Sequence, residues 1–197
     1  MKVKEIKKLH FATVLVITTF VILPSAAWAN LIVDGGFNTP DFNATAWTSC
    51  SLGISWTQEV EKTEGTHGLG QINDRIWQDF EAIPETTYLI QAYCKTAADF
   101  PMFRETRLGV DWFDINNDII GSNCDRVVGP IPYWIHRSLI DTTPLNTVKG
   151  RLWIETMGGG TAYWDDVSVT VVPEPSTILL VTIGLVGFFG LRRRLKK

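Results

Sequence analysis

The chain has 197 residues, of which 45% are hydrophobic, 20% are charged and 11% are aromatic, and its formal net charge is −3. Eight Trp and ten Phe supply more apolar surface than disordered chains carry, and the net negative charge argues against a nucleic-acid-binding protein. The charge is unevenly distributed, because residues 30–172 hold 9 basic and 19 acidic side chains while both ends are basic and apolar. This pattern predicts an acidic body between two terminal segments of a different kind.

The N-terminal segment has the three parts of a secretory signal peptide. Four lysines within the first eight residues are followed by an uncharged stretch, Phe11 to Leu23, and then by Pro24. As a helix this stretch would be about 20 Å long, too short for a stable membrane anchor. Ala27 and Ala29 form the small-x-small pattern that signal peptidase requires. We therefore expect residues 1–29 to be a signal peptide and the mature protein to begin at residue 30.

The C-terminal segment combines a rigid motif, a short apolar stretch and a basic end. Pro173, Glu174 and Pro175 precede an uncharged stretch that ends at Leu191, and Arg192, Arg193 and Arg194 follow it. Positive charge at this end predicts that it stays in the cytoplasm while the body lies outside. We expect a transmembrane helix over residues 177–191. Its length of about 24 Å, counted from residue 176, is near the lower limit for a span.

This order of features resembles the PEP-CTERM sorting signal of bacterial surface proteins, over residues 173–197. The resemblance implies that exosortase, a membrane-embedded enzyme, processes the tail, so that the membrane holds the precursor only transiently. It also implies a Gram-negative-type bacterium that makes extracellular polysaccharide, as in a biofilm. An ordinary single-pass C-terminal anchor is the alternative interpretation, and the sequence leaves open the cut site near Pro173.

Short β-rich runs separated by turn residues predict an all-β body over residues 30–172. Their spacing favours an antiparallel β-sandwich or jelly roll. The predicted strands are 54–60, 75–80, 88–94, 106–113, 134–140, 148–155 and 163–171. Alternation predicts buried rows, among them Tyr88, Ile90, Ala92 and Cys94 on one strand. The strand at 134–140 has no clear face.

The body also contains three short motifs: Asp34-Gly35-Gly36-Phe37 near its start, Trp77-Gln78-Asp79-Phe80 in the middle and Tyr163-Trp164-Asp165-Asp166 at its end. This series is similar to galactose-binding-like jelly rolls of the carbohydrate-binding module 4/9 type. The resemblance implies a sandwich fold and a non-catalytic sugar-binding role.

A sugar site needs an aromatic ring against the C–H face of the sugar, beside planar polar groups that bond its hydroxyls. Side chains predicted to point outward from the strands fit this requirement. The candidates are Trp77, Tyr93, Phe113 and Trp153 as platforms, with Gln91, Asp111, Arg151 and Glu155 as hydrogen-bonding partners. The alternative is that these aromatic rings pack under loops or in a second core layer.

Related jelly rolls often carry a structural calcium that joins the first strand to the last. The resemblance implies that the ligands here are the carbonyls of Gly36 and His67 and the side chains of Asn38, Glu64 and Asp165. Calcium prefers such hard oxygen ligands. Asn38 departs from the usual pattern, in which an acid stands at this position, and this lowers the negative charge of the site.

No catalytic constellation is recognisable in the body. His67 and His136 belong to no nucleophile or zinc motif. Asp165 and Asp166 are neighbours on a predicted strand and should point to opposite faces, so they cannot flank one glycosidic bond. We therefore expect a protein that is not an enzyme, although a secreted glycosidase is the least favoured alternative.

The three cysteines, Cys50, Cys94 and Cys124, allow at most one internal disulfide. Alternation places Cys94 on an apolar face as a small core residue. A bridge between Cys50 and Cys124 is one possibility that the sequence leaves open.

The sequence predicts an exported, non-catalytic protein of the cell surface or extracellular matrix. Its expected partners are signal peptidase, exosortase and extracellular polysaccharide, and no nucleic acid. The competing interpretation is a structural or adhesive surface protein without a defined sugar site.

Overall fold

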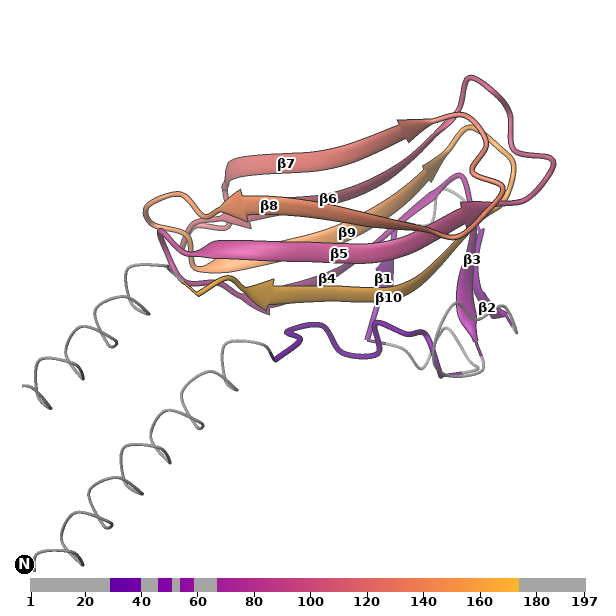
Figure 1. The fold of residues 1–197 in the computed structure, drawn as a ribbon. Coiled ribbons are helices and arrows are strands. Elements are labelled where there is room, and N and C mark those ends of the chain that lie inside the picture. Colours follow the sequence, from indigo (N-terminus) through magenta and orange to yellow (C-terminus); the bar gives the residue numbers. More distant parts are fainter. Residues whose placement is uncertain (1–28, 40–45, 51–53, 59–66, 174–197) are drawn as a thin grey trace, which may run out of the picture. The chain divides into compact units, whose positions relative to one another are not determined.

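A computed structural model describes residues 29–39, 46–50, 54–58 and 67–173. Across these segments the chain is all-β, with two five-stranded antiparallel sheets that pack as a sandwich and no helix (Figure 1). The predicted fold class is thus confirmed. The strands are β1 (Thr48–Ser49), β2 (Ile54–Gln58), β3 (Gly68–Ile72), β4 (Asp74–Glu81), β5 (Thr87–Thr96), β6 (Glu105–Phe113), β7 (Ile119–Val128), β8 (Ile135–Thr142), β9 (Lys149–Met157) and β10 (Ala162–Val171).

The strand order differs from the chain order, as expected for a jelly roll. Sheet A has the order β1-β4-β9-β6-β7, and sheet B has the order β2-β3-β10-β5-β8. Consecutive strands often lie in different sheets, so the chain crosses repeatedly between the two layers. Strands β7 and β8 are edge strands of different sheets, and both lie on the same side of the sandwich (Figure 1).

The core lies between the two sheets and follows the predicted alternation. Sheet B contributes the row from Tyr88 to Cys94 on β5, in which every second side chain is at most 1% exposed. The ring of Trp112 from sheet A packs 5.4 Å from the ring of Tyr88 and 5.9 Å from that of Phe80, centroid to centroid. Its Nε1 donates a hydrogen bond of 2.6 Å to Asp141 Oδ2. Burial of these large rings is the main contribution to the stability of the sandwich.

One buried charge crosses the core near the β7–β8 side. Arg137 on β8 is 3% exposed, and its Nε lies 2.6 Å from Asp125 Oδ2 on β7. Its other nitrogens donate to Thr106 Oγ1 at 2.9 Å and to the Asp125 carbonyl at 2.8 Å. The Arg137 guanidinium carbon lies 5.3 Å from the centroid of the Trp164 ring. These contacts satisfy the guanidinium and tie the edges of the two sheets together.

Three strands were not predicted from the sequence. They are β1, β3 and β7, and β7 is ten residues long. The side chains of β7 alternate between half-buried and exposed, without a buried apolar row. An edge strand of this kind gives no hydrophobic alternation from which to predict it.

The three cysteines are free, and the possible bridge between Cys50 and Cys124 does not form. Cys50 follows β1 and hydrogen-bonds to β4, at one edge of sheet A, whereas Cys124 lies on β7 at the opposite edge. Four strand spacings of about 4.8 Å separate these edges, far beyond the Cα separation of a disulfide. Cys94 is completely buried, as predicted, and burial raises the pKa of its thiol to about 12.

Residues 1–28 of the predicted signal peptide and most of the sorting tail, residues 174–197, lie outside the described residues. In the part of the chain that is described, no helix is long and apolar enough to cross a membrane. Residues 29–170 form one compact unit.

Candidate functional site

The outer faces of the two sheets differ in chemistry, and the predicted sugar-binding residues are divided between them. Strand parity places six of the eight on sheet A and two on sheet B. Those on sheet A are Trp77, Asp111, Phe113, Arg151, Trp153 and Glu155, and those on sheet B are Gln91 and Tyr93. The structure therefore does not bring all eight into one site.

The outer face of sheet A is covered by a row of paired charges that runs across four strands. Arg75 on β4 donates two hydrogen bonds of 3.1 Å to Glu155 on β9. Glu155 also accepts from Arg107 on β6 at 3.4 Å, and Arg107 pairs with Glu105 on the same strand. Arg126 on β7 completes the row at 3.2 Å from Glu105. The carboxylates of this row are all paired with guanidinium groups, although the buried Arg107 Nε has no hydrogen-bond partner in the described part of the chain.

Two of the predicted aromatic platforms on this face are buried beneath cations. Trp153 is 4% exposed; its ring lies over Gly109, and the guanidinium carbon of Arg75 stands 4.2 Å from its centroid. Phe113 is also 4% exposed, with Lys149 Nζ 4.4 Å from its ring centroid. Neither ring offers a free face on which a sugar could stack. Trp77, the direct cross-strand partner of Trp153, is half-buried and more accessible.

A second ion pair lies beside Trp77. Arg151 donates to both oxygens of Asp79, at 2.6 and 3.0 Å, and Lys149 lies 3.4 Å from the same carboxylate. The hydrogen bond from Arg151 is the main reason that the pKa of Asp79 is lowered, and the same bond raises the pKa of Arg151. The guanidinium carbon of Arg151 lies 5.2 Å from the Trp77 ring centroid. This corner therefore consists of an accessible ring beside a satisfied ion pair.

The outer face of sheet B carries aromatic rings without such a charge ladder. Gly70 on β3 is the cross-strand partner of Trp56 on β2 and of Tyr163 on β10. The Trp56 ring lies over Gly70, since a Cβ built on this glycine would stand 2.6 Å from Trp56 Cε2. The absence of a side chain at position 70 therefore lets the indole lie flat on the sheet between two strands. Trp56 and Tyr163 are both half-buried.

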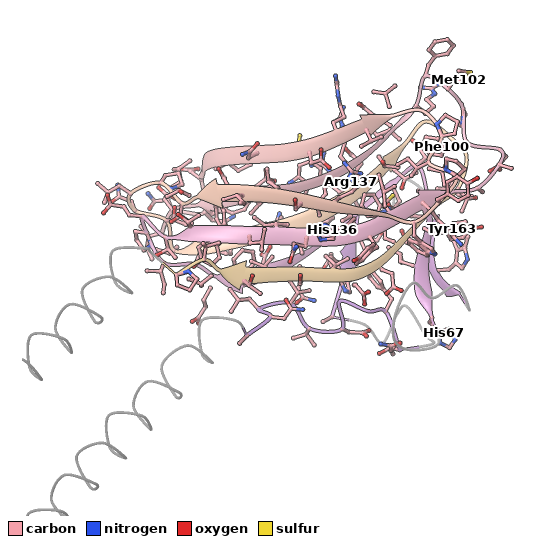
Figure 2. The ribbon with its side chains drawn as sticks, in the orientation of Figure 1. His67, Phe100, Met102, His136, Arg137 and Tyr163 are labelled. Carbon is pink, nitrogen blue, oxygen red and sulfur yellow. The ribbon has the colours of Figure 1, made fainter. Side chains whose placement is uncertain are left out.

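The aromatic row continues onto β5 and β8. Lys95 Nζ lies 5.3 Å from the Tyr163 ring centroid and 4.8 Å from that of Trp134. Tyr93 faces His136 across the strands, with 5.1 Å between their ring centroids. Figure 2 labels Tyr163 and His136 on this sheet.

Polar groups stand between the rings. Gln91 Nε2 lies 2.9 Å from His136 Nε2, so an amide and an imidazole are joined at the exposed end of the row. On the outward positions of β5 and β8 the polar side chains are hydroxyls, this amide, this imidazole and the amine of Lys95. Rings interleaved with hydrogen-bond donors and acceptors are what a flat, hydroxyl-rich ligand requires.

Five members of this face were missed by the sequence analysis: Trp56, Lys95, Trp134, His136 and Tyr163. Lys95 lies one residue beyond the predicted strand 88–94. Tyr163 could have been found, because it alternates with the buried Ala162 and Trp164 on a predicted strand. Trp56 could not, since its position depends on pairing with β3, which was not predicted. Trp134 and His136 lie in the segment for which no face could be assigned.

The expected calcium ligands are brought together in part. A Cβ on Gly36 would lie 2.9 Å from Asn38 Nδ2 and 3.9 Å from Asp165 Oδ1, so these three residues converge. Asp165 is completely buried and accepts a 2.7 Å hydrogen bond from the Asp166 N–H. His67 is described and half-buried, whereas Glu64 lies outside the described residues. Within the described segments no three His, Cys, Asp or Glu side chains cluster.

One buried oxygen near this turn lacks a partner in the described part of the chain. Asp34 Oδ1 accepts from the Asn38 N–H at 3.0 Å, but Asp34 Oδ2 has no hydrogen-bond partner. A buried carboxylate oxygen is costly unless a donor or a cation satisfies it. The carboxylate oxygens of Asp34 and Asp165 are of the kind that a hard cation such as calcium prefers.

The fold is that of carbohydrate-binding modules. The chain is similar to the CBM22-1 xylan-binding domain of Paenibacillus barcinonensis Xyn10C, with a TM-score of 0.57 and 12% identity over 75% of this chain and 97% of that one. It is similar to a family 16 carbohydrate-binding module, with a TM-score of 0.54 and 21% identity over 72% of this chain and 99% of that one. It also resembles the enzymatically active domain of bacteriophage CBA120 tailspike protein 4, with a TM-score of 0.61 and 10% identity. That match covers 73% of this chain but only 21% of the tailspike chain.

The tail supplies the second identification. Residues 171–194 match the family described as the PEP-CTERM protein-sorting motif, so the resemblance predicted for the C-terminus is confirmed. The motif marks an exported protein that is processed by exosortase. The chain is therefore a PEP-CTERM-bearing protein with a body like a carbohydrate-binding module. No curated protein matches it.

Proposed function

We propose that this protein is a non-catalytic surface or matrix protein that binds extracellular polysaccharide through the outer face of sheet B. The observation that carries the proposal is the row formed by Trp56, Tyr163, Trp134 and Tyr93, with Lys95, Gln91 and His136 beside it. Five strands at about 4.8 Å spacing make this face about 20 Å wide, so it offers several ring-sized contacts to an extended chain. Multiple weak stacking contacts suit a polymer better than a single small molecule.

Sorting supports the same function. The signal peptide would direct export and be removed by signal peptidase after Ala29. The tail would halt in the membrane until exosortase cuts near Pro173. The product would then reside on the cell surface or in the extracellular matrix of a Gram-negative-type bacterium. A formal charge of −10 on residues 30–172 would keep the body from collapsing onto anionic cell surfaces.

Calcium is proposed as a structural ion rather than as part of the glycan site. Asn38, Asp165 and the Gly36 carbonyl would hold it, with Glu64 and the His67 carbonyl completing the set. The ion would join the N-terminal segment to β10, which already meet where the Leu31 N–H donates to the Val169 carbonyl at 2.9 Å. If so, the chelator EDTA should lower the unfolding temperature and added calcium should restore it. An unchanged midpoint would remove the ion from the proposal.

The glycan proposal is tested by affinity electrophoresis and isothermal titration against soluble polysaccharides, first with the unmodified protein. We expect saturable binding to at least one polysaccharide, and Trp56→Ala or Tyr163→Ala should weaken it about tenfold or more, as for the loss of one stacked ring. Trp77→Ala, on the outer face of sheet A, is the matched control and should bind normally. Absence of saturable binding would favour the structural or adhesive alternative, and release of reducing ends would favour a glycosidase.

A further inference from the structure

Strand β7 ends sheet A with one side unpaired. In the described part of the chain its only neighbour in the sheet is β6, and it forms the outer margin of the sheet in Figure 1. The exposed N–H and C=O groups of such a strand can pair with another strand. The opposite edge of sheet A is β1, which is only two residues long. The two edges of this sheet are therefore very different in their capacity to pair.

The hydrogen bonds to β6 show which groups of β7 face outward. The Gly129 N–H donates to the Arg104 carbonyl at 2.8 Å, one step beyond the pair Glu105 and Val128. Hydrogen-bonded pairs alternate with non-bonded pairs in an antiparallel ladder, so the odd-numbered residues of β7 bond to β6. The even-numbered residues direct their N–H and C=O groups to the free edge. These residues are Ser122, Cys124, Arg126 and Val128, and their side chains are all exposed.

Natural edge strands are usually protected by shortness, by charged side chains or Pro, by bulges, or by charges that point inward. β7 has ten residues and contains neither Lys nor Pro. Its one irregularity lies near the start, where the register with β6 shifts between Trp112 and Phe113. From Gly121 to Val128 the edge is regular, and its two charged side chains, Asp125 and Arg126, are both held in ion pairs. The edge therefore has no free charge that would oppose pairing with another strand.

We propose that β7 pairs antiparallel with β7 of a second copy of this chain, across a two-fold axis at Cys124. In this register Cys124 faces Cys124 of the second copy and Ser122 faces Arg126. Val128, 56% exposed, then comes opposite Ile120, which is 37% exposed and lies at the register shift, so the two apolar ends lie near each other. A shift by two residues would set Arg126 against Ile120, or Val128 against Ser122. Of the three registers, only the one centred on Cys124 places the apolar ends of the two strands opposite each other.

The pairing would join two copies of sheet A into one continuous sheet, with about six new backbone hydrogen bonds between Ser122, Cys124 and Arg126 of the two copies. Cross-strand partners lie on the same face, so the outer faces of both copies of sheet B would point to the same side. The dimer itself does not depend on a glycan site. Its consequence does rest on the proposed function: two glycan-binding faces directed to one side would bind a polysaccharide bivalently.

Crosslinking tests the register with the full-length chain solubilised in detergent. In a Cys50→Ser background, mild oxidation should give a disulfide-linked dimer through Cys124, because a hydrogen-bonded pair has Cα atoms about 5.5 Å apart. With Cys124→Ser added, a mixture of Ser122→Cys and Arg126→Cys copies should crosslink, whereas either variant alone should not. Equal crosslinking of Ser122→Cys alone would overturn the register.

Mass measurement by light scattering, without glycan, tests the dimer itself. Cys124→Pro removes only an outward N–H and should leave the β6–β7 ladder intact while making the chain monomeric. Cys124→Ser, the matched control, should remain dimeric. Should the proline variant unfold, Cys124→Lys serves instead, because it places two lysines opposite each other and should reduce the dimer severalfold. A monomeric unmodified chain, or a dimer that persists in the lysine variant, would overturn the proposal.

Discussion

Trp56 and Tyr163 are both cross-strand partners of Gly70, one from each neighbouring strand of sheet B. The glycine leaves room for the Trp56 ring to lie over the sheet and extend toward Tyr163. Sheet A has the same arrangement of a ring over a glycine, but there the ring is buried: Trp153 lies over Gly109 and is 4% exposed. Gly70 thus lies beneath the half-buried Trp56 ring, and Gly109 lies beneath the buried Trp153 ring.

This contrast predicts different outcomes for two glycine substitutions. Gly70→Ala would push the Trp56 ring from its place, because the new Cβ would come 2.6 Å from it, and should weaken glycan binding with little loss of stability. Gly109→Ala would bring a Cβ to 2.2 Å from the buried Trp153 ring and should lower the free energy of unfolding by about 1–3 kcal/mol. Titration with polysaccharide and urea denaturation measure the two effects. A Gly70→Ala protein that binds normally would exclude Trp56 from the site.

The sequence predicted the sandwich and most of its core, since rows such as Tyr88, Ile90, Ala92 and Cys94 alternate strictly and are buried. It could not predict β3 and β7, whose sequences do not show this alternation. Without β3, the pairing that places Trp56 beside Tyr163 was invisible. The alternation of side chains along a strand predicts which ones point outward, but not to which sheet the strand belongs. Trp153 and Tyr93 were therefore predicted as members of one sugar site although they lie on different sheets.

The burial of outward-facing aromatic side chains is the second feature of the site that the sequence could not predict. Phe113 and Trp153 do point outward, as their parity predicts, but cations from neighbouring strands cover them. Those cations come from β4 and β9, which are distant in sequence from the rings that they cover. Local patterns cannot reveal such cover, because it depends on which strands are neighbours.

The buried Arg137 should be important for stability. Arg137→Ala would leave Thr106 and Asp125 without their partner and should lower the free energy of unfolding by about 3 kcal/mol. Arg126→Ala is the matched control, because its side chain is 60% exposed and its surface ion pair should contribute less than about 1 kcal/mol. Urea denaturation of both variants measures the difference. Equal effects would mean that the buried network contributes no more than a surface pair.

The pair Asp79–Arg151 predicts a specific pH dependence. The pKa of Asp79 is lowered from 3.8, so the folded state favours the ionised carboxyl, and this stabilisation is complete above pH 3.8. It should be lost as the pH falls below this value through the lowered pKa. Asp79→Asn should therefore be less stable than the unmodified protein at neutral pH, and the gap should close in acid. A gap in unfolding temperature that stays constant down to pH 2 would contradict this account.

The thiols should differ sharply in reactivity. Cys94 is completely buried and its pKa is raised to about 12, so it should resist alkylation in the folded protein. Cys124 is exposed and should react with iodoacetamide when the chain is monomeric. Ser122→Pro provides such a monomer and keeps Cys124, because the proline removes an outward N–H of β7. Mass spectrometry of tryptic peptides, with and without denaturant, measures this. Rapid labelling of Cys94 in native buffer would mean that the core opens readily.

The central claim is that glycan lies on the outer face of sheet B, and oxidative footprinting with bound polysaccharide tests it most directly. Peptide mass spectrometry compares side-chain oxidation before and after the polysaccharide is added. We predict protection of Trp56, Tyr93, Trp134 and Tyr163, with no change at Trp77 on sheet A. Protection of Trp77 with unchanged oxidation of the sheet B rings would contradict the account.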